Sequence, residues 1–502
     1  MNRFMMAGAA LGAALAAYAE VRIDTAHDRV QTTFAPGFAR IGTVAQREAK
    51  STGRSRIALG CEMLPRGYGS FDAFKDYIPP LGVARVRLQA GWAKLEPERG
   101  KLDFAWLDRQ VDYLLAHGIS PILETSYGNT AYSNAGGPSL SDGLPRGEDG
   151  RKAWDAFIDR LAEHYRDRVT EWFCWNEPNN DPKLNPPELA ADNNIRTARL
   201  IRKHNGAAKI GMLTMSWPDV EYARRALEVM KRENALGLFT WVVYHDYSPN
   251  PDASAGNVAR LGRLARTYAP QLRLFNGESG ATSDPHFSSP ISSGAWCSEL
   301  TQAKWNCRRV IADIGRDIDS LVFTIYDPCY DNARRYTAAR KIPRYWIRRD
   351  EDHFMKRMGL LKCNEAKQVV KVKAAYYAIQ NLASIFDSGI RTDKFPVVCR
   401  CDLLPGSVAT YRFRRAGGGE RILAYWNCVS HPENDNATSE AVFVADAGCE
   451  FAAPVLVDVV TGAIYEVGKS AIGKTRDGKT SYALPIYDAP LLLTEKSLVI
   501  RE

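Results

Sequence analysis

The sequence lacks several features that would assign it to a simple class. Its 502 residues contain ten cysteines, but none of these has zinc-binding or Cys-x-x-Cys redox spacing, and they do not resemble a small disulfide framework. The net charge of +8 is spread over both halves instead of being concentrated in a tail, which argues against nucleic-acid binding. With 45% apolar and 25% charged residues, the composition is that of a folded globular protein, and the length favours two domains.

Long apolar runs are also absent, and the only candidate is at the N-terminus. Met1–Ala19 has Arg3 as a positive n-region, Met5–Ala16 as an apolar h-region and Ala17-Tyr18-Ala19 as a cleavage pattern. The apolar run is too short to span a bilayer comfortably, although an uncleaved anchor is an alternative. We therefore expect a signal peptide over residues 1–19, a secreted or periplasmic mature protein that begins at Glu20, and no stable membrane insertion after cleavage.

From about Arg56 onward, short apolar runs alternate with helical patterns, which is typical of a parallel β/α protein. Strands are expected at 57–64, 84–89, 120–125, 169–175, 209–215, 239–244, 272–276 and 321–326. Helical spacing is present over 104–117, 154–165, 219–232 and 369–386. The predicted fold class is α/β, a (β/α)8 TIM barrel over residues 53–388. A doubly wound open sheet is less favoured, because no Gly-x-Gly-x-x-Gly follows the first strand.

After the barrel the pattern changes to short β-type runs separated by Gly, Asp and Asn turns. These runs cover 408–412, 422–426, 441–444, 454–459, 464–467 and 491–494. They predict a C-terminal antiparallel β-sandwich over residues 389–502. Residues 20–52 form an N-terminal extension, in which 21–34 is a candidate to add a strand or two to the sandwich.

Two glutamates stand at the ends of predicted barrel strands. Glu177 follows an aromatic strand within Trp175-Asn176-Glu177-Pro178, and Glu278 ends a second apolar strand within Asn276-Gly277-Glu278. Strand ends at the C-terminal face of a barrel are where this fold places its active site. A pair of carboxylates is what glycoside hydrolysis requires. The alternative for Glu177 is a surface turn after a core strand.

These motifs resemble clan A of the glycoside hydrolases, the retaining (β/α)8 enzymes. The resemblance includes Val86–Pro97 followed by Gly100–Asp108 on strand two, Trp175–Pro178 on strand four, His245-x-Tyr247 on strand six and Gly277-Glu278 on strand seven. The barrel with a following small sandwich is similar to glycoside hydrolase family 39, the β-xylosidase and α-iduronidase family, and to some family 5 members.

The resemblance implies a role for each matching residue. Glu278 would be the nucleophile and Glu177 the acid/base. Asn176 would hold the sugar 2-hydroxyl, and Arg87 and Tyr247 would hydrogen-bond Glu278. Arg87 has an alternative as an ion pair at the barrel base, and Tyr247 has one as rim packing.

Further residues are expected to contact the carbohydrate substrate. These are Trp92, Trp175 and His245, together with Phe323 or Tyr326 in place of the clan's strand-eight tryptophan. His245 could instead be a core histidine. Glu124, at the end of strand three, could be a substrate ligand, but it is interpreted as a solvated loop carboxylate. No metal and no cofactor are expected, because the carboxylate pair suffices and no His/Asp cluster has ligand spacing.

The segment 327–361 is long, non-periodic and rich in arginine, lysine and aromatic residues. It could shape the subsites and pair with an acidic or sulfated glycan, although a solvated face is the commoner explanation. The leading hypothesis is an exported retaining glycosidase. A catalytically inactive carbohydrate-binding protein on the same barrel is the alternative, and an unrelated β/α barrel enzyme is less favoured. Partners other than carbohydrate are not indicated, and the oligomeric state is unknown from the sequence.

Overall fold

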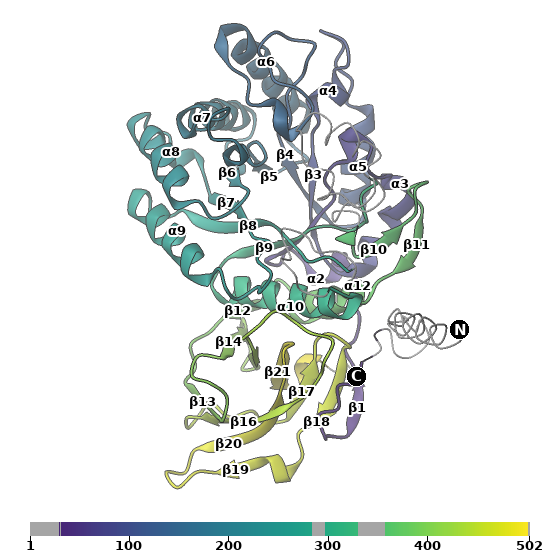
Figure 1. Cartoon of the computed structure of the whole chain (residues 1–502), viewed down its shortest axis with the longest axis vertical. Helices are drawn as coiled ribbons and strands as arrows, with labels where there is room; N and C mark the ends of the chain where they lie inside the picture. Colours follow the sequence, from purple (N-terminus) through teal and green to yellow (C-terminus); the bar gives the residue numbers. More distant parts are fainter. Residues whose placement is uncertain (1–29, 31, 284–296, 330–356, 500–502) are drawn as a thin grey trace, which may run out of the picture.

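The computed structural model describes residues 30, 32–283, 297–329 and 357–499. Within them, eight parallel strands form a closed barrel in the order in which they occur in the chain (Figure 1). The strands are β2 (Ile57–Gly60), β3 (Arg85–Gln89), β4 (Ser120–Glu124), β5 (Glu171–Phe173), β6 (Lys209–Met215), β7 (Trp241–His245), β8 (Arg273–Ser279) and β9 (Asp319–Val322). The predicted (β/α)8 barrel is confirmed. The predicted signal peptide and most of the basic segment, residues 330–356, lie outside the described residues.

Apolar side chains from six of the eight strands fill the barrel. Ala58, Ile122, Phe173, Trp241, Val243, Phe275 and Leu321 form one buried cluster. Phe173, Trp241 and Phe275 meet edge to face at centroid distances of 5.0–6.5 Å. The interior is therefore a packed core, and only the strand ends are left for chemistry.

Helices surround this barrel. The longer ones are α5 (Ala105–Ala116), α6 (Gly147–Tyr165), α7 (Pro187–His204), α8 (Val220–Arg232), α9 (Ala255–Tyr268), α10 (Glu299–Gly315) and α12 (Ala374–Ile385). Single-turn helices are α2 (Ala49–Thr52), α3 (Phe71–Phe74), α4 (Trp92–Leu95) and, at the C-terminus, α13 (Lys496–Val499). None of the helices in the described residues combines the length and apolar character needed to cross a membrane.

Several predicted elements have different bounds in the structure, and three of them have a clear physical reason. The expected helix over 369–386 begins only at Ala374, because the β-branched residues before it form β11 (Val369–Val372), which pairs with β10 (Leu361–Cys363). The first barrel strand ends at Gly60, before Met63 turns the chain with a φ of 67°. The eighth strand ends at Val322. Beyond it, the Phe323 amide donates to the Ser279 carbonyl and the Ile325 amide donates to the Gly60 carbonyl.

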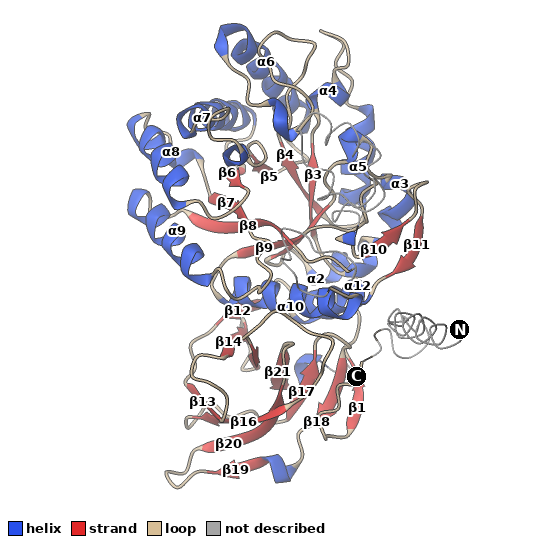
Figure 2. Ribbon diagram, viewed as in Figure 1, coloured by secondary structure: helices blue, strands red, loops and turns tan. Residues whose placement is uncertain are grey.

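The predicted antiparallel sandwich is also confirmed, and it has two sheets (Figure 2). The seven-stranded sheet has the order β1-β18-β17-β21-β15-β14-β12, and the four-stranded sheet the order β13-β16-β20-β19. The strands are β1 (Arg40–Thr43), β12 (Ile390–Thr392), β13 (Val397–Cys401), β14 (Val408–Arg415), β15 (Arg421–Asn427), β16 (Ser439–Ala445), β17 (Pro454–Asp458), β18 (Ala463–Glu466), β19 (Ile472–Lys474), β20 (Thr480–Ile486) and β21 (Leu491–Glu495). Strand β1 comes from the N-terminal extension and pairs antiparallel with β18.

Barrel and sandwich meet along α10 and α12, which lie between them in Figure 1. Every residue of α10 from Leu300 to Ile314 is buried, including three cations. A helix that is buried all round has neighbours on every side. The sandwich is thus packed onto the barrel wall next to its last two strands.

Candidate active site

Glu177 follows the fourth barrel strand in an unusual backbone conformation. Its φ of 49° and ψ of 51° are left-handed, and Trp175 two residues earlier has a φ of 42°. The Glu177 amide donates to the Thr214 carbonyl at 2.8 Å, and Pro178 begins a short 3-10 helix. Such conformations cost about 1–3 kcal/mol for a residue other than glycine and cluster at functional sites. The surface-turn interpretation is therefore wrong, since Glu177 is held in place by the next strand.

Glu278 lies on the seventh strand, β8, with a side chain that is 8% exposed. Arg87 Nη2 donates to its Oε1 at 2.6 Å, and the Tyr247 hydroxyl donates to its Oε2 at 2.7 Å. Burial raises the pKa of Glu278, but the charges of His245 and Arg87 and the hydrogen bonds from Tyr247 and Arg87 outweigh burial. The pKa is therefore below its ordinary value, and the carboxylate is ionised near neutral pH.

His245, the last residue of β7, joins the two glutamates. Its Nδ1 lies 2.7 Å from Glu177 Oε1 and 3.4 Å from Glu278 Oε2. One carboxylate oxygen of Glu177 and one of Glu278 lie within 4.8 Å of each other. His245 is fully buried, as the core interpretation requires, but its ring contacts both carboxylates.

Asn176 has both ends of its amide occupied. Its Oδ1 accepts from Arg87 Nη2 at 3.0 Å, and its Nδ2 donates to the Tyr127 hydroxyl at 2.7 Å. Next to it, Asn180 Nδ2 donates to Glu177 Oε2 at 2.7 Å. Tyr127 and Asn180 are residues that sequence reasoning missed. Their only signal was position, just after a barrel strand or just after the glutamate.

Arg87 is the centre of this arrangement. Besides Glu278, its guanidinium lies 2.9 Å from Glu124 Oε2 and 3.5 Å from Glu62 Oε1, and it donates to the Gly277 carbonyl at 2.7 Å. The base-ion-pair interpretation of Arg87 is therefore wrong, because these partners are at strand ends.

The interpretation of Glu124 as a solvated loop carboxylate is also wrong. Glu124 is 0% exposed, and Gln89 Nε2 donates to it at 3.0 Å. Glu62 was missed, although a glutamate just past an apolar strand was an available signal. Burial raises the pKa of Glu62 to about 8, partly offset by Arg87 and increased by Glu278 and Glu124. Burial also raises the pKa of Glu124.

Three of the aromatic residues expected to bind sugar are packed inside the protein instead. Trp92 stacks on Tyr132 and Phe157 at 5.3 and 5.1 Å, and its indole N–H donates to Glu96. These contacts occupy its ring faces.

Trp175 and Tyr326 are enclosed in the same way. Trp175 is held edge to face by Tyr127 and Trp154. Tyr326 stacks on Phe74 at 4.8 Å and donates its hydroxyl to the Glu62 carbonyl. The predictions for Trp92, Trp175 and Tyr326 are therefore wrong.

Phe323, the other strand-eight aromatic, is also buried, with 1% of it exposed, but it packs beside the site. Its ring meets Tyr247 edge to face at 6.0 Å and packs with Met63 and Met358. Since Tyr247 hydrogen-bonds Glu278, Phe323 is one residue removed from that carboxylate. Tyr247 thus packs against Phe323 and also donates a hydrogen bond to Glu278.

Trp217 is an aromatic residue that sequence reasoning missed. It is 46% exposed and follows Ser216, whose amide and hydroxyl both donate to Asn179 Oδ1. Asn179 is two residues beyond Glu177. An indole left in solvent at the C-terminal end of barrel strand β6 therefore lies on the Glu177 side. Its signal was a tryptophan directly after the fifth strand.

Glu177, His245 and Glu278 also have the donor atoms of a metal site. The surroundings oppose a cation there. Both Glu278 oxygens accept hydrogen bonds from Arg87 and Tyr247, and the Arg87 charge is 2.6 Å from one of them. A cation would have to displace these donors and approach a guanidinium. Among the described residues, no other group of three such side chains meets the same spacing.

The fold, an eight-stranded parallel barrel with a β-sandwich attached, is similar to that of solved glycoside hydrolases of families 39 and 30. The model of glycoside hydrolase family 42, described as beta-galactosidase, matches residues 77–156. A family 39 glycoside hydrolase from the gut symbiont Bacteroides cellulosilyticus superposes with a TM-score of 0.61 at 15% identity, covering 90% of this chain and 82% of its own.

Two further solved structures are similar over most of their length. A monomeric beta-xylosidase from Caulobacter crescentus has a TM-score of 0.55 at 17% identity, covering 90% of this chain and 97% of its own. A GH30 endoxylanase from Clostridium papyrosolvens has a TM-score of 0.54 at 12% identity, with coverage of 90% and 97%. At these identities the likeness establishes the fold, sandwich included.

Proposed function

We propose that this protein is an exported retaining glycoside hydrolase, with Glu278 as nucleophile and Glu177 as acid/base. The observation that carries the proposal is the carboxylate pair, whose nearest oxygens lie within 4.8 Å. Retaining enzymes hold their carboxyl groups about 5–5.5 Å apart, and inverting ones about 6.5–9.5 Å. Export rests on the N-terminal segment 1–19, and N-terminal sequencing of protein recovered outside the cytoplasm tests it.

In the first step, Glu278 attacks the anomeric carbon while the bond to the leaving oxygen breaks. Glu177 donates its proton to that oxygen, and a covalent glycosyl-enzyme forms. Arg87 and Tyr247 keep Glu278 ionised before the attack. In the second step, Glu177 takes a proton from water, the water oxygen attacks the anomeric carbon, and Glu278 leaves as a carboxylate.

His245 and Asn176 have supporting roles in this proposal. His245 contacts Glu177 and Glu278 from one side and fixes their relative orientation. Arg87 and Tyr127 hold the Asn176 amide in one orientation, and in this proposal the amide contacts the 2-hydroxyl of the reacting sugar. In this class of enzyme, substrate distortion and hydrogen bonds to the 2-hydroxyl that strengthen in the transition state together contribute on the order of several kcal/mol.

The test is sugar release from a panel of glycosides by wild type and Glu278→Gln side by side. Xylosides and xylan come first, because the similar structures are named beta-xylosidase and endoxylanase, followed by beta-galactosides and acidic or sulfated glycans. We expect wild type to cleave at least one substrate and Glu278→Gln to lose at least about 10³-fold in kcat. Activity that survives in Glu278→Gln would mean that another carboxylate is the nucleophile. Binding without cleavage by both proteins would favour the inactive carbohydrate-binding protein.

A further inference from the structure

The loop after strand β7, residues 246–254, connects the active site to the sandwich. It begins with Asp246, which stands between His245 and Tyr247 in the chain. The Asp246 amide donates to the Glu278 carbonyl at 2.9 Å. Its carboxylate accepts from the Ser248 amide and hydroxyl at 3.1 and 2.8 Å. The place of Tyr247 above Glu278 therefore depends on how this loop is held.

Helix α10 holds the start of the loop. Arg309 Nη1 lies 3.1 Å from Asp246 Oδ2, and Ser254 donates its hydroxyl to the same carboxylate. Trp305 donates its indole N–H to the Ser248 and Pro249 carbonyls at 3.0 and 3.1 Å. The loop is thus fastened to α10 on both sides of Tyr247.

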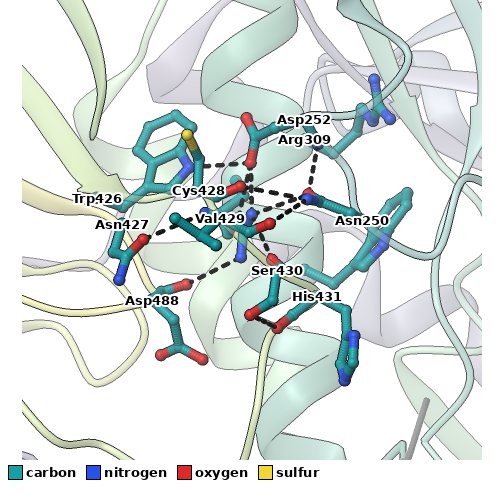
Figure 3. A network of polar contacts seen from close by, with 12 residues as sticks. Asn250, Asp252, Arg309, Trp426, Asn427, Cys428, Val429, Ser430, His431 and Asp488 are labelled. Atoms are coloured by element: carbon teal, nitrogen blue, oxygen red, sulfur yellow. Dashed lines mark hydrogen bonds and ion pairs between the residues drawn. The ribbon is translucent and has the colours of Figure 1, made fainter. Parts of the chain in front are cut away.

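The far part of the loop reaches the sandwich (Figure 3). Trp426, at the end of β15, donates its indole N–H to Asp252 Oδ2 at 3.1 Å. Asn250 Nδ2 donates to the Cys428 carbonyl at 3.2 Å. Asn250 and Asp252 therefore have partners in a different domain from the loop that carries them.

Arg308, one residue before Arg309 on α10, ties these contacts together. Its Nη2 donates to Asp252 Oδ2 at 2.6 Å, to Asn250 Oδ1 at 3.0 Å and to the Ser430 carbonyl at 3.0 Å. The side chain is 0% exposed. A buried guanidinium is costly unless it is fully paired, so the loop and the sandwich must stay in register for Arg308 to be satisfied.

Lys304 provides an internal contrast on the same helix. It is also buried, but it binds only sandwich groups: Asp488 Oδ1 at 2.6 Å and the Glu433 and Asp435 carbonyls at 2.6 and 3.1 Å. Lys304 therefore docks the sandwich without touching the loop. Docking alone does not require the contacts that Arg308, Asn250 and Asp252 make.

We propose that the sandwich positions the active site: Trp426 and the 428–430 carbonyls, acting through Asn250, Asp252 and Arg308, fix the loop that places Tyr247 and His245 against the two glutamates. Trp426, Asn250, Asp252 and Arg308 are positioning residues, since none of them touches the reacting groups. The inference rests on the proposed function for its kinetic readout and on the geometry alone for its spectroscopic one.

The experiment compares Trp426→Phe and Asp252→Asn with Tyr247→Phe in the full-length chain. Trp426→Phe removes the donor to Asp252 but keeps a ring on Tyr411, which stacks at 5.4 Å. Asp488→Asn is the matched control, because its side chain serves Lys304 and the Glu433 amide and contacts no residue of the loop. Kinetics are measured over pH, and the His245 ring is followed by ¹⁵N NMR with histidine labelling, assigned with His245→Gln.

We expect Trp426→Phe and Asp252→Asn to lower kcat about tenfold with KM changed less than about twofold. The acid limb of kcat/KM should move to higher pH, as in Tyr247→Phe, because a looser Tyr247 no longer lowers the pKa of Glu278. The groups that face Glu278 besides Tyr247 are Arg87, His245, Glu62, Glu124 and Glu177, and neither substitution alters any of these side chains chemically. In a protein that already carries Tyr247→Phe, Asp252→Asn should lower kcat and shift the acid limb only a little further.

If Trp426→Phe and Asp252→Asn only lower Tm, as is expected of Asp488→Asn, and leave kcat and the acid limb unchanged, the positioning role is wrong. Should Asp252→Asn fail to fold, Trp426→Phe decides alone. If wild type hydrolyses nothing, the proposed function fails, and the His245 signals still test the coupling. They should shift in Trp426→Phe and not in Asp488→Asn, and unshifted signals in Trp426→Phe would overturn the inference.

Discussion

Arg85 and Arg87 point to the same side of β3, one at each end of the barrel interior, and both are buried among carboxylates. At the base, Arg85 Nε donates to Glu171 Oε2 at 2.9 Å and Nη1 donates to Asp319 Oδ2 at 3.1 Å. Both partners are the first residues of their strands, β5 and β9. At the opposite end, Arg87 meets Glu62, Glu124 and Glu278.

The two ends differ in how their charges are balanced. The base has additional cations: Arg273 Nη2 lies 2.8 Å from Asp319 Oδ1, and Lys209 Nζ lies 3.9 Å from Glu171. Burial raises the pKa of Glu171. The positive charges of Arg85, Arg54 and Lys209 together outweigh burial and bring this pKa below its ordinary value.

At the other end, one guanidinium faces three carboxylates, and the pKa of Glu62 rises to about 8 because burial dominates. The same residue types thus make a satisfied ionic layer at the base and an excess of acidic groups at the catalytic end. Perturbed carboxyl groups of this kind concentrate at functional sites, where stability is given up for reactivity.

The largest expected effect is the difference in kcat/KM between the Arg87→Lys and Arg85→Lys variants. A lysine keeps the charge but loses the planar fork that reaches several acceptors at once. In Arg87→Lys, Glu278 and Asn176 lose their shared donor, and kcat/KM should fall by at least about 100-fold with a small change in Tm. Arg85→Lys should lower Tm, with a loss of about 1–3 kcal/mol, and leave kcat/KM of the folded protein nearly unchanged. Equal kinetic losses in both variants would remove the distinction between the two ends.

Glu62→Gln and Glu171→Gln should change stability with opposite signs. The folded pKa of Glu62 is about 8 against an ordinary 4.5, so the folded state holds a proton that the unfolded state releases between these values. Wild type therefore loses about 1.4 kcal/mol per pH unit over that window, and Glu62→Gln, which cannot ionise, escapes this loss.

Glu171 has a lowered folded pKa, so its ionised form stabilises the fold above pH 4.5, and this contribution fades as pH falls through the folded value. Glu171→Gln should hence be less stable than wild type at neutral pH. Urea unfolding at pH 5 and pH 8 checks both variants. A Glu62→Gln protein whose stability relative to wild type does not increase between these pH values would contradict the raised pKa.

The smallest effect is expected on the surface at the catalytic end. Trp217→Ala should raise KM about fivefold, or about 1 kcal/mol, by removing apolar surface that a leaving-group sugar would cover, with kcat little changed. Leu404→Ala is the comparison, because Leu404 is 74% exposed on the sandwich, away from the barrel strand ends. Initial rates over a range of substrate concentrations distinguish the two. An unchanged KM in Trp217→Ala would place the sugar elsewhere.

The barrel was predictable because most of its strands are short, mainly apolar runs in which nearly every residue is buried, and such runs carry a strong local signal. Arg87, Tyr247, Glu177 and Glu278 were predicted from strand ends and motifs, and the structure brings them together around His245 and Glu278. The prediction went wrong where burial decides: Trp92, Trp175 and Tyr326 have the composition of a sugar platform, but tertiary packing covers their rings.

Glu62 and Glu124 show the opposite limit. A glutamate is usually solvated, so Glu124 was interpreted as a loop carboxylate, and Glu62, within the strand predicted over 57–64, was given no role. Their partner is Arg87, which is adjacent only after the barrel closes. The loop 246–254 and its sandwich contacts were hidden for the same reason, since Asp252 and Trp426 meet only in the assembled molecule.

Strand β1 has a consequence for how the chain is made. Arg40 pairs with Tyr465 and Thr43 with Ala463, so an edge strand synthesised early waits for its neighbour until nearly the whole chain exists. Contacts of such large sequence separation slow folding, and an unpaired edge invites association with other chains meanwhile. A ribosome-bound chain that already holds a complete barrel would thus still expose β1, and a fragment that starts after the barrel would leave β18 as a bare edge. The seven-stranded sheet is therefore complete only when β1, from the N-terminal extension, pairs with β18 from the C-terminal domain.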